Sequence, residues 1–202
     1  MIPVIRTKYY LAICCILFSV NVIGQSWRKS QLDSANTAMH ISFLTANEKG
    51  AIQYINLCRL YPADFAAIEV INYNMDSAFE DSVLMQFDIY KKSLLKDLAT
   101  RVPCKALLPD KVLYLDAKCY ANEISKADRK GHERIDCKES NYSECLSFGM
   151  ETGREIALQW LIDEGIVSLG HRINCLHPGS VKIGLCTNKH FEYGFCAVAE
   201  FE

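Results

Sequence analysis

Two histidines directly follow a glycine in polar stretches of the chain, His132 and His171. Two neighbouring acids, Asp163 and Glu164, end a helical pattern shortly before His171. Two neutral imidazoles and two carboxylates could hold a divalent metal such as zinc with an open coordination position. The same groups could instead bind one another by hydrogen bonds around a water molecule. Both alternatives stay open, because the groups lie on separate segments and their spacing does not decide between them.

Other sequence signals narrow the chemistry. The chain contains no phosphate-binding loop, dinucleotide fingerprint, His-Glu-x-x-His zinc motif or Gly-x-Ser-x-Gly nucleophile elbow. The formal net charge of -2 is nearly neutral and gives no reason to expect a nucleic-acid partner. The remaining histidines, His40, His177 and His190, have no identifiable partner in the sequence, so we interpret them as surface or structural residues.

The N-terminus has the features of a secretory signal peptide. A basic start with Arg6 and Lys8 precedes an apolar run from Tyr9 to Val20, and small or tolerated residues follow at the usual cleavage positions. The apolar run is shorter than the ~20 residues that a membrane span needs, which favours cleavage over anchoring. We therefore expect residues 1–24 to be removed, with no transmembrane anchor left, and the mature chain to be secreted or periplasmic.

Cysteine content agrees with export. Cleavage of the signal peptide leaves eight of the ten cysteines, and an even number in an exported chain indicates disulfides. No Cys-x-x-Cys pair is present, which argues against a zinc ribbon. Cys186 and Cys196 flank a predicted hairpin turn and could face each other, while Cys137 and Cys145 flank a short loop. Cys58 lies on an apolar helix face and is interpreted as a buried thiol.

Helical signals dominate the chain before its C-terminal strands. Capping boxes at Thr45–Glu48 and Thr152–Glu155 predict helix starts. Apolar periodicity predicts further helices over residues 82–101 and 111–127. Near the end of the chain the apolar residues alternate on both sides of a turn over residues 188–193, which predicts an antiparallel hairpin. Helices first and strands last indicate an α+β domain.

The segment from Gly170 to Pro178, Gly-His-Arg-Ile-Asn-Cys-Leu-His-Pro, resembles the bacterial Gly-His-Arg-x-Asn-x-Leu-x-Pro signature of the CAP superfamily. This family comprises the cysteine-rich secretory, antigen 5 and pathogenesis-related-1 proteins, and its domain is also called the SCP domain. Further motifs resemble that family in order and spacing over about residues 110–201: Leu113, Ala117 and Ala121 in its Leu-x-x-x-Ala-x-x-x-Ala helix, Gly131-His132, Glu144 before Leu146 and Gly149, and Trp160 with Asp163 in its Trp-x-x-Glu motif.

This resemblance implies a three-layer α-β-α sandwich with a central groove and a C-terminal antiparallel hairpin. Residues 25–44 would form a lead-in segment and residues 45–202 a single CAP/SCP-like domain. The groove would hold a tetrad of two histidines and two acids, which correspond here to His132, Glu144, Asp163 and His171.

Three positions depart from the family pattern. Asp163 stands where glutamate is usual, with the adjacent Glu164 as a rival for the same role. Cys145 replaces the asparagine that normally follows the first acid. The region 72–103 has no counterpart that we can match, and its predicted helix could form a lid over the groove.

The resemblance favours an exported, groove-type binding module over an enzyme, because no nucleophile or leaving-group machinery is visible. The expected partner is a small apolar, lipid- or sterol-like ligand or an extracellular protein, with zinc or another divalent metal held by the tetrad. The alternative is a metal-assisted hydrolase or peptidase, in which His132 and His171 hold the metal, Glu144 is the general base and Asp163 is a ligand or orienting group. In a third interpretation the tetrad only stiffens the fold.

Overall fold

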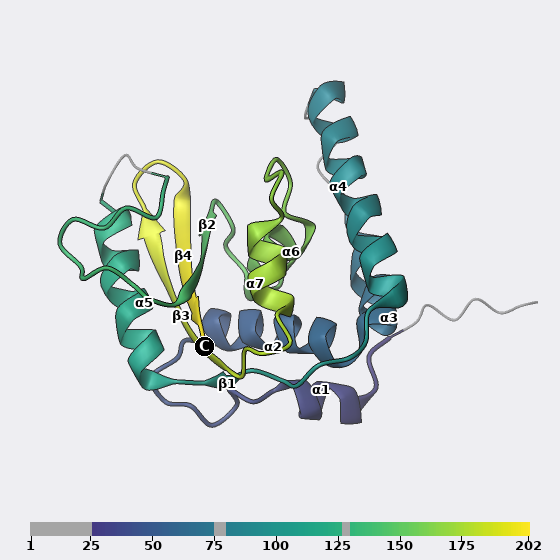
Figure 1. The fold of residues 1–202 in the computed structure, drawn as a ribbon, viewed down its shortest axis with the longest axis horizontal. Coiled ribbons are helices and arrows are strands. Elements are labelled where there is room, and N and C mark those ends of the chain that lie inside the picture. Colours follow the sequence, from purple (N-terminus) through teal and green to yellow (C-terminus); the bar gives the residue numbers. More distant parts are fainter. Residues whose placement is uncertain (1–25, 75–79, 127–129) are drawn as a thin grey trace, which may run out of the picture.

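The computed structural model of the chain describes residues 26–74, 80–126 and 130–202. Within these ranges the chain forms seven α-helices, one π-helical turn and a four-stranded mixed sheet (Figure 1). The α+β class predicted from the sequence is therefore confirmed. The predicted signal peptide, residues 1–24, lies outside the described residues. No helix among the described residues combines the length and apolar character needed to cross a membrane.

The helices and strands have the following bounds. The helices are α1 (Lys29–Ala35), α2 (Ala46–Leu60), α3 (Pro62–Phe65), the π-helical turn (Ala66–Val70), α4 (Asp81–Thr100), α5 (Lys111–Ile124), α6 (Gly153–Ile162) and α7 (Gly170–Leu176). The strands are β1 (Leu108–Pro109), β2 (Ser143–Phe148), β3 (Lys182–His190) and β4 (Gly194–Phe201).

The sheet has the strand order β1-β3-β4-β2, with β1 parallel to β3 and the other pairs antiparallel. Helix α5 packs against β3 and β4, while α6 and α7 pack beside β2, so the sheet lies between helices (Figure 1). Gly184 permits the close approach of α5 to β3. A Cβ atom at this position would lie 2.0 Å from the backbone carbon of Leu113, which no side chain could tolerate.

Both capping boxes form as predicted. The Thr45 hydroxyl accepts a hydrogen bond from the Glu48 amide at 3.3 Å, and Glu48 in turn accepts one from the Thr45 amide at 2.7 Å. Thr152 and Glu155 repeat the arrangement at the start of α6. The predicted helices over 82–101 and 111–127 are α4 and α5, each ending slightly earlier than expected. These signals succeed because they act within one helical turn.

The C-terminal hairpin forms, but its turn is shorter than expected. Strand β3 continues through His190, so the turn occupies residues 191–193 instead of 188–193. The imidazole of His190 explains the difference, because its Nδ1 accepts hydrogen bonds from the amides of Glu192 and Tyr193 at 3.1 and 3.2 Å. His190 is buried and has a structural role, as predicted.

The structure contains one disulfide among the described residues, Cys119–Cys137, which ties α5 to the loop that follows it. The sequence analysis considered Cys145 as the neighbour of Cys137 across a short loop. The structure instead pairs Cys137 with Cys119. Cys186 and Cys196 do not stand directly opposite each other either. In the strand register Cys186 pairs with Val198, two residues away from Cys196. Both of these thiols are free, and Cys58 is a buried free thiol, as predicted.

Arg59 of α2 ties the centre of the fold together. Its guanidinium is completely buried and donates only to backbone carbonyls. Nε binds the carbonyl of Lys105 at 2.8 Å, Nη1 binds those of Cys175 and His177 at 2.8 and 3.0 Å, and Nη2 binds that of Ser180 at 2.7 Å. These carbonyls include the unsatisfied C-terminal end of α7, so one cation positions the helix that carries His171.

Candidate functional site

Asp163 and His171 form a pair at the junction of α6 and α7, with Asp163 buried and His171 partly exposed. Asp163 ends α6 with a left-handed backbone (φ 59°), a conformation that aspartate tolerates better than most residues. This turn brings its Oδ1 to 2.7 Å from Nδ1 of His171, while its Oδ2 accepts the amide of Arg172 at 3.1 Å. Asp163 is therefore the acid that contacts His171, and the neighbouring Glu164 is not. The sequence context of His171 predicts a loop, but the residue lies in the first turn of α7.

Arg172 stabilises the junction of α6 and α7 through hydrogen bonds to α6 and α4. Its Nε and Nη2 donate to the carbonyls of Leu161 and Ile162 at 2.7 and 2.8 Å, which satisfies the C-terminal end of α6. Nη1 and Nη2 also reach α4, where they bind the Ser93 hydroxyl at 3.0 Å and the Tyr90 carbonyl at 3.3 Å. A single buried side chain therefore holds α4, α6 and the His171 turn in one arrangement.

The free edge of β2 is covered by side chains of α6 and α7. Alternate carbonyls of this edge strand accept hydrogen bonds from three of them: Asn174 binds Glu144 O at 3.0 Å, Trp160 binds Leu146 O at 2.7 Å, and Gln159 binds Phe148 O at 3.2 Å. These side chains replace a fifth strand and prevent pairing with another chain. They also fix the distance between β2 and the His171 turn.

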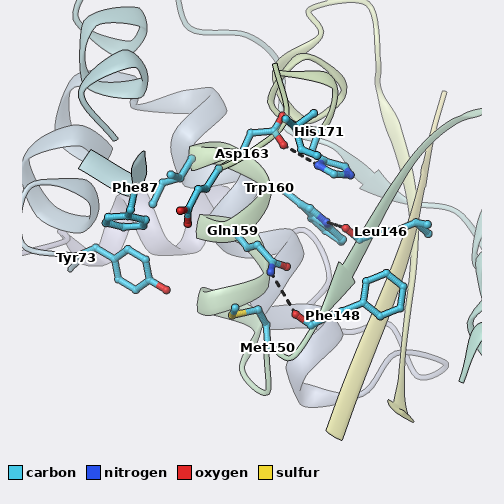
Figure 2. A pocket seen from close by; sticks show the side chains of 12 residues that line it. Tyr73, Phe87, Leu146, Phe148, Met150, Gln159, Trp160, Asp163 and His171 are labelled. Carbon is cyan, nitrogen blue, oxygen red and sulfur yellow. Dashed lines mark hydrogen bonds and ion pairs between the residues drawn. The ribbon is translucent and has the colours of Figure 1, made fainter. Parts of the chain in front are cut away.

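A cavity of about 320 Å³ opens beside the Asp163–His171 pair (Figure 2). Most of its lining is apolar and comes from the segment after the π-helical turn, α4, β2, α6 and the α6–α7 loop. The lining residues are Tyr73, Phe87, Leu146, Phe148, Met150, Gln159, Trp160, Ile162, Asp163, Glu164, Ile166 and His171. Burial raises the pKa of Glu164 at this cavity. The arrangement combines an apolar surface with one oriented imidazole.

His132, in the loop before β2, and Glu144 of β2 form a second pair. Nδ1 of His132 lies 2.6 Å from Oε1 of Glu144, and Arg134 donates to Oε2 of the same carboxylate at 2.5 Å. Arg134 is buried and also binds Glu200, as well as Asp116 at 3.1 Å. The sequence analysis did not identify Arg134 or Glu200, because their common contacts join segments far apart in the chain.

The charged groups of this second cluster change one another's pKa values. The hydrogen bond to Glu144 raises the pKa of His132, against opposing effects of burial and of Arg134. Burial would raise the pKa of Glu144, but hydrogen bonds with His132, Glu200 and Arg134 outweigh it and the pKa is lowered. Burial and the adjacent Glu144 carboxylate raise the pKa of Glu200 to about 9. Glu200 therefore carries the proton of this carboxyl pair.

The proton held by Glu200 predicts that the free energy of unfolding depends on pH, and that Glu200→Gln removes this dependence. Because the folded-state pKa of Glu200 lies above its ordinary 4.5, the folded protein keeps a proton that the unfolded chain releases. Stability therefore falls as pH rises from about 4.5 to about 9. Relative to Glu200→Gln, we expect the wild-type free energy of unfolding to fall by up to about 1.4 kcal/mol per pH unit. Urea unfolding of both proteins between these pH limits measures the difference, and parallel profiles would contradict the assignment.

The structure places the four predicted tetrad residues on neighbouring elements, as two separate histidine–acid pairs. The sulfur of Cys145 lies 3.7 Å from the carbonyl of His171, so β2 and α7 are in contact between the pairs. His132 and Glu144 nevertheless line a different hollow, of about 290 Å³, which shares no lining residue with the cavity beside His171. Among the described residues, Nε2 of His132 and Nε2 of His171 have no hydrogen-bond partner.

The donor set fits a metal site only in part. A carboxylate on Nδ1 is the arrangement that orients metal-binding histidines and leaves Nε2 to face the ion. Across the described ranges, however, no three His, Cys, Asp or Glu side chains are grouped so that they could hold a metal ion. A zinc site needs at least three such protein ligands, so we derive no chemical step through a metal.

No protein-family model matches this sequence, and no curated protein matches it either.

Proposed function

We propose that this chain is an exported protein of the CAP/SCP type that binds a small, mainly apolar ligand in the cavity beside His171. The observation that carries the proposal is the combination of an apolar cavity with the Asp163–His171 pair on its wall (Figure 2). The positions of helices on both sides of the sheet support the three-layer α-β-α arrangement of that family. A cavity of about 320 Å³ falls in the lower range of small-molecule sites.

The geometry of the cavity also indicates which hydrogen-bonding group the ligand should have. In the neutral form of His171, Nδ1–H donates to Asp163, so Nε2 is left as a hydrogen-bond acceptor. An acceptor on the wall of an apolar cavity selects a ligand that has one donor on an apolar body. The proposed ligand class is therefore a lipid- or sterol-like alcohol. Phe87 of α4 lines the same cavity, which supports a lid or wall function for the unmatched region 72–103.

Blocking the cavity tests this proposal. Ile166 lines the cavity, whereas its neighbour Val167 is 92% exposed and does not line it. We expect Ile166→Trp to weaken binding of dodecanol by at least about tenfold, because the larger ring fills space that the alkyl chain needs. Val167→Trp is the matched control and should bind as the wild type does. Native mass spectrometry measures both. Equal binding by the two variants, or no binding by the wild type, would contradict the proposal.

The alternative function is a metal-assisted hydrolase, and the two free Nε2 atoms are the observation in its favour. Two features weigh against it. The proposed general base, Glu144, is bound by Arg134 and has a lowered pKa, which makes it a weak base. The two histidines also line separate hollows. Calorimetric titration with zinc separates the functions: binding that is lost in both His132→Ala and His171→Ala would favour the hydrolase.

A further inference from the structure

Four free cysteines lie close to where α2, α7 and β2 meet. Cys58, Cys145 and Cys175 are completely buried, and Cys104 is half-buried beside them. Burial and the neighbouring Cys175 thiol raise the pKa of Cys58, with a smaller contribution from Cys104. Burial also raises the pKa of Cys145. Buried thiols with raised pKa values are poor nucleophiles, so Cys58 and Cys145 are better suited to a structural role than to catalysis.

Cys145 of β2 and Cys175 of α7 lie where these two elements contact each other. The side chain of Cys175 adjoins that of Cys145 and, after burial, is the main cause of its raised pKa. The Cys145 sulfur also lies 3.7 Å from the carbonyl of His171, one helical turn before Cys175. One residue earlier on both elements, Asn174 donates to the Glu144 carbonyl at 3.0 Å. These contacts fix the register of β2 against α7 and place Cys145 beside the helical turn that leads to Cys175.

We propose that Cys145 and Cys175 form a second disulfide when the chain folds in an oxidising environment. With oxidised glutathione as the oxidant, one cysteine thiolate attacks the glutathione disulfide and releases one glutathione thiol. The second cysteine thiolate then attacks the protein sulfur of this mixed disulfide and releases the second glutathione. The two cysteines lose two electrons and two protons, and one glutathione disulfide becomes two thiols. Because both sulfurs are buried in the finished fold, the bond forms during folding.

Such a bond would join the strand that carries Glu144 to the helix that carries His171. It would close a loop that contains the whole of α6 and the turn at Asp163. The relative position of the two histidine–acid pairs would then be fixed covalently as well as by the Asn174 hydrogen bond. This role is independent of the ligand proposed for the cavity.

Peptide mapping tests the proposal directly. The reduced, denatured chain is refolded in a glutathione redox buffer, alkylated under denaturing conditions and digested without reduction. We expect a cross-linked peptide pair that contains Cys145 and Cys175, in addition to the Cys119–Cys137 pair. Cys58→Ser should keep the new cross-link and Cys175→Ser should lose it. Alkylation of both Cys145 and Cys175 in the refolded wild type, or a cross-link from Cys175 to Cys58, would overturn the proposal.

A thermal measurement provides a second readout that does not depend on the single-cysteine variants. In the Cys119→Ser/Cys137→Ser background the proposed bond is the one that a reductant would break. We expect reduction to lower the Tm of this variant by roughly 5–10 °C, as for a typical structural disulfide in a chain of this size. If the variant refolds and its Tm is the same in oxidised and reduced form, the proposal is wrong.

Discussion

Replacing Arg134 with methionine is expected to destabilise the protein by about 3–5 kcal/mol. The guanidinium is buried and contacts three carboxylates, those of Asp116, Glu144 and Glu200. Methionine fills a similar volume but leaves the buried Glu144 and Glu200 side chains and the partly exposed Asp116 without a cation. Their mutual repulsion and lost hydrogen bonds cause the effect. Urea unfolding followed by circular dichroism measures it.

A double-mutant cycle gives this prediction its control. Combining Arg134→Met with Glu144→Gln removes the ionised carboxylate that Arg134 contacts, so the combined loss should be smaller than the sum of the single losses. Arg28→Met is the matched surface control, because the Arg28 side chain is 74% exposed. It should change the free energy of unfolding by less than about 0.5 kcal/mol. Additive losses in the cycle would show that Arg134 does not act through Glu144.

Replacing Arg59 with methionine is the second large change, with an expected loss of about 3–5 kcal/mol. The arginine donates to four backbone carbonyls, those of Lys105, Cys175, His177 and Ser180, and methionine can donate to none of them. Because two of these carbonyls belong to the C-terminal end of α7 and the turn after it, the variant should also loosen the helix that carries His171. Amide hydrogen exchange of residues 170–177 should rise more than that of α5.

Arg59→Lys separates charge from geometry. A lysine keeps the positive charge but cannot donate to carbonyls in several directions at once, so it should recover only a minor part of the loss. Full recovery by lysine would mean that charge alone matters, and the carbonyl-binding account of Arg59 would then be wrong.

Local signals explain what the sequence could predict. The two capping boxes and the long amphipathic helices depend on contacts within one or two turns, and they lie where expected. Helix α7 was not predicted because it is only seven residues long and begins after a left-handed residue, Leu169, without a capping side chain. The partner of His171 could not be chosen between Asp163 and Glu164, because the choice depends on a backbone turn that has no clear sequence signal.

Long-range contacts explain what the sequence could not predict. The Cys119–Cys137 bond depends on how the loop after α5 folds back, and spacing alone permits many pairings. Arg134 stands only two residues from the predicted His132, yet its partner Glu200 comes from the last strand. Glu200 sits in a strand that is buried on both faces, where an acid would not be expected without a cation beside it.

The most direct test of the central claim is a calorimetric titration of the protein with dodecanol and with its methyl ether, which has no hydroxyl proton to donate. If the ligand hydroxyl binds Nε2 of His171, His171→Ala should weaken dodecanol binding by roughly tenfold and bring it to the level of the ether. His132→Ala, which changes the matching pair in the other hollow, should leave dodecanol binding unchanged. Equal effects of the two variants, or equal affinity of the wild type for alcohol and ether, would contradict a ligand site at His171.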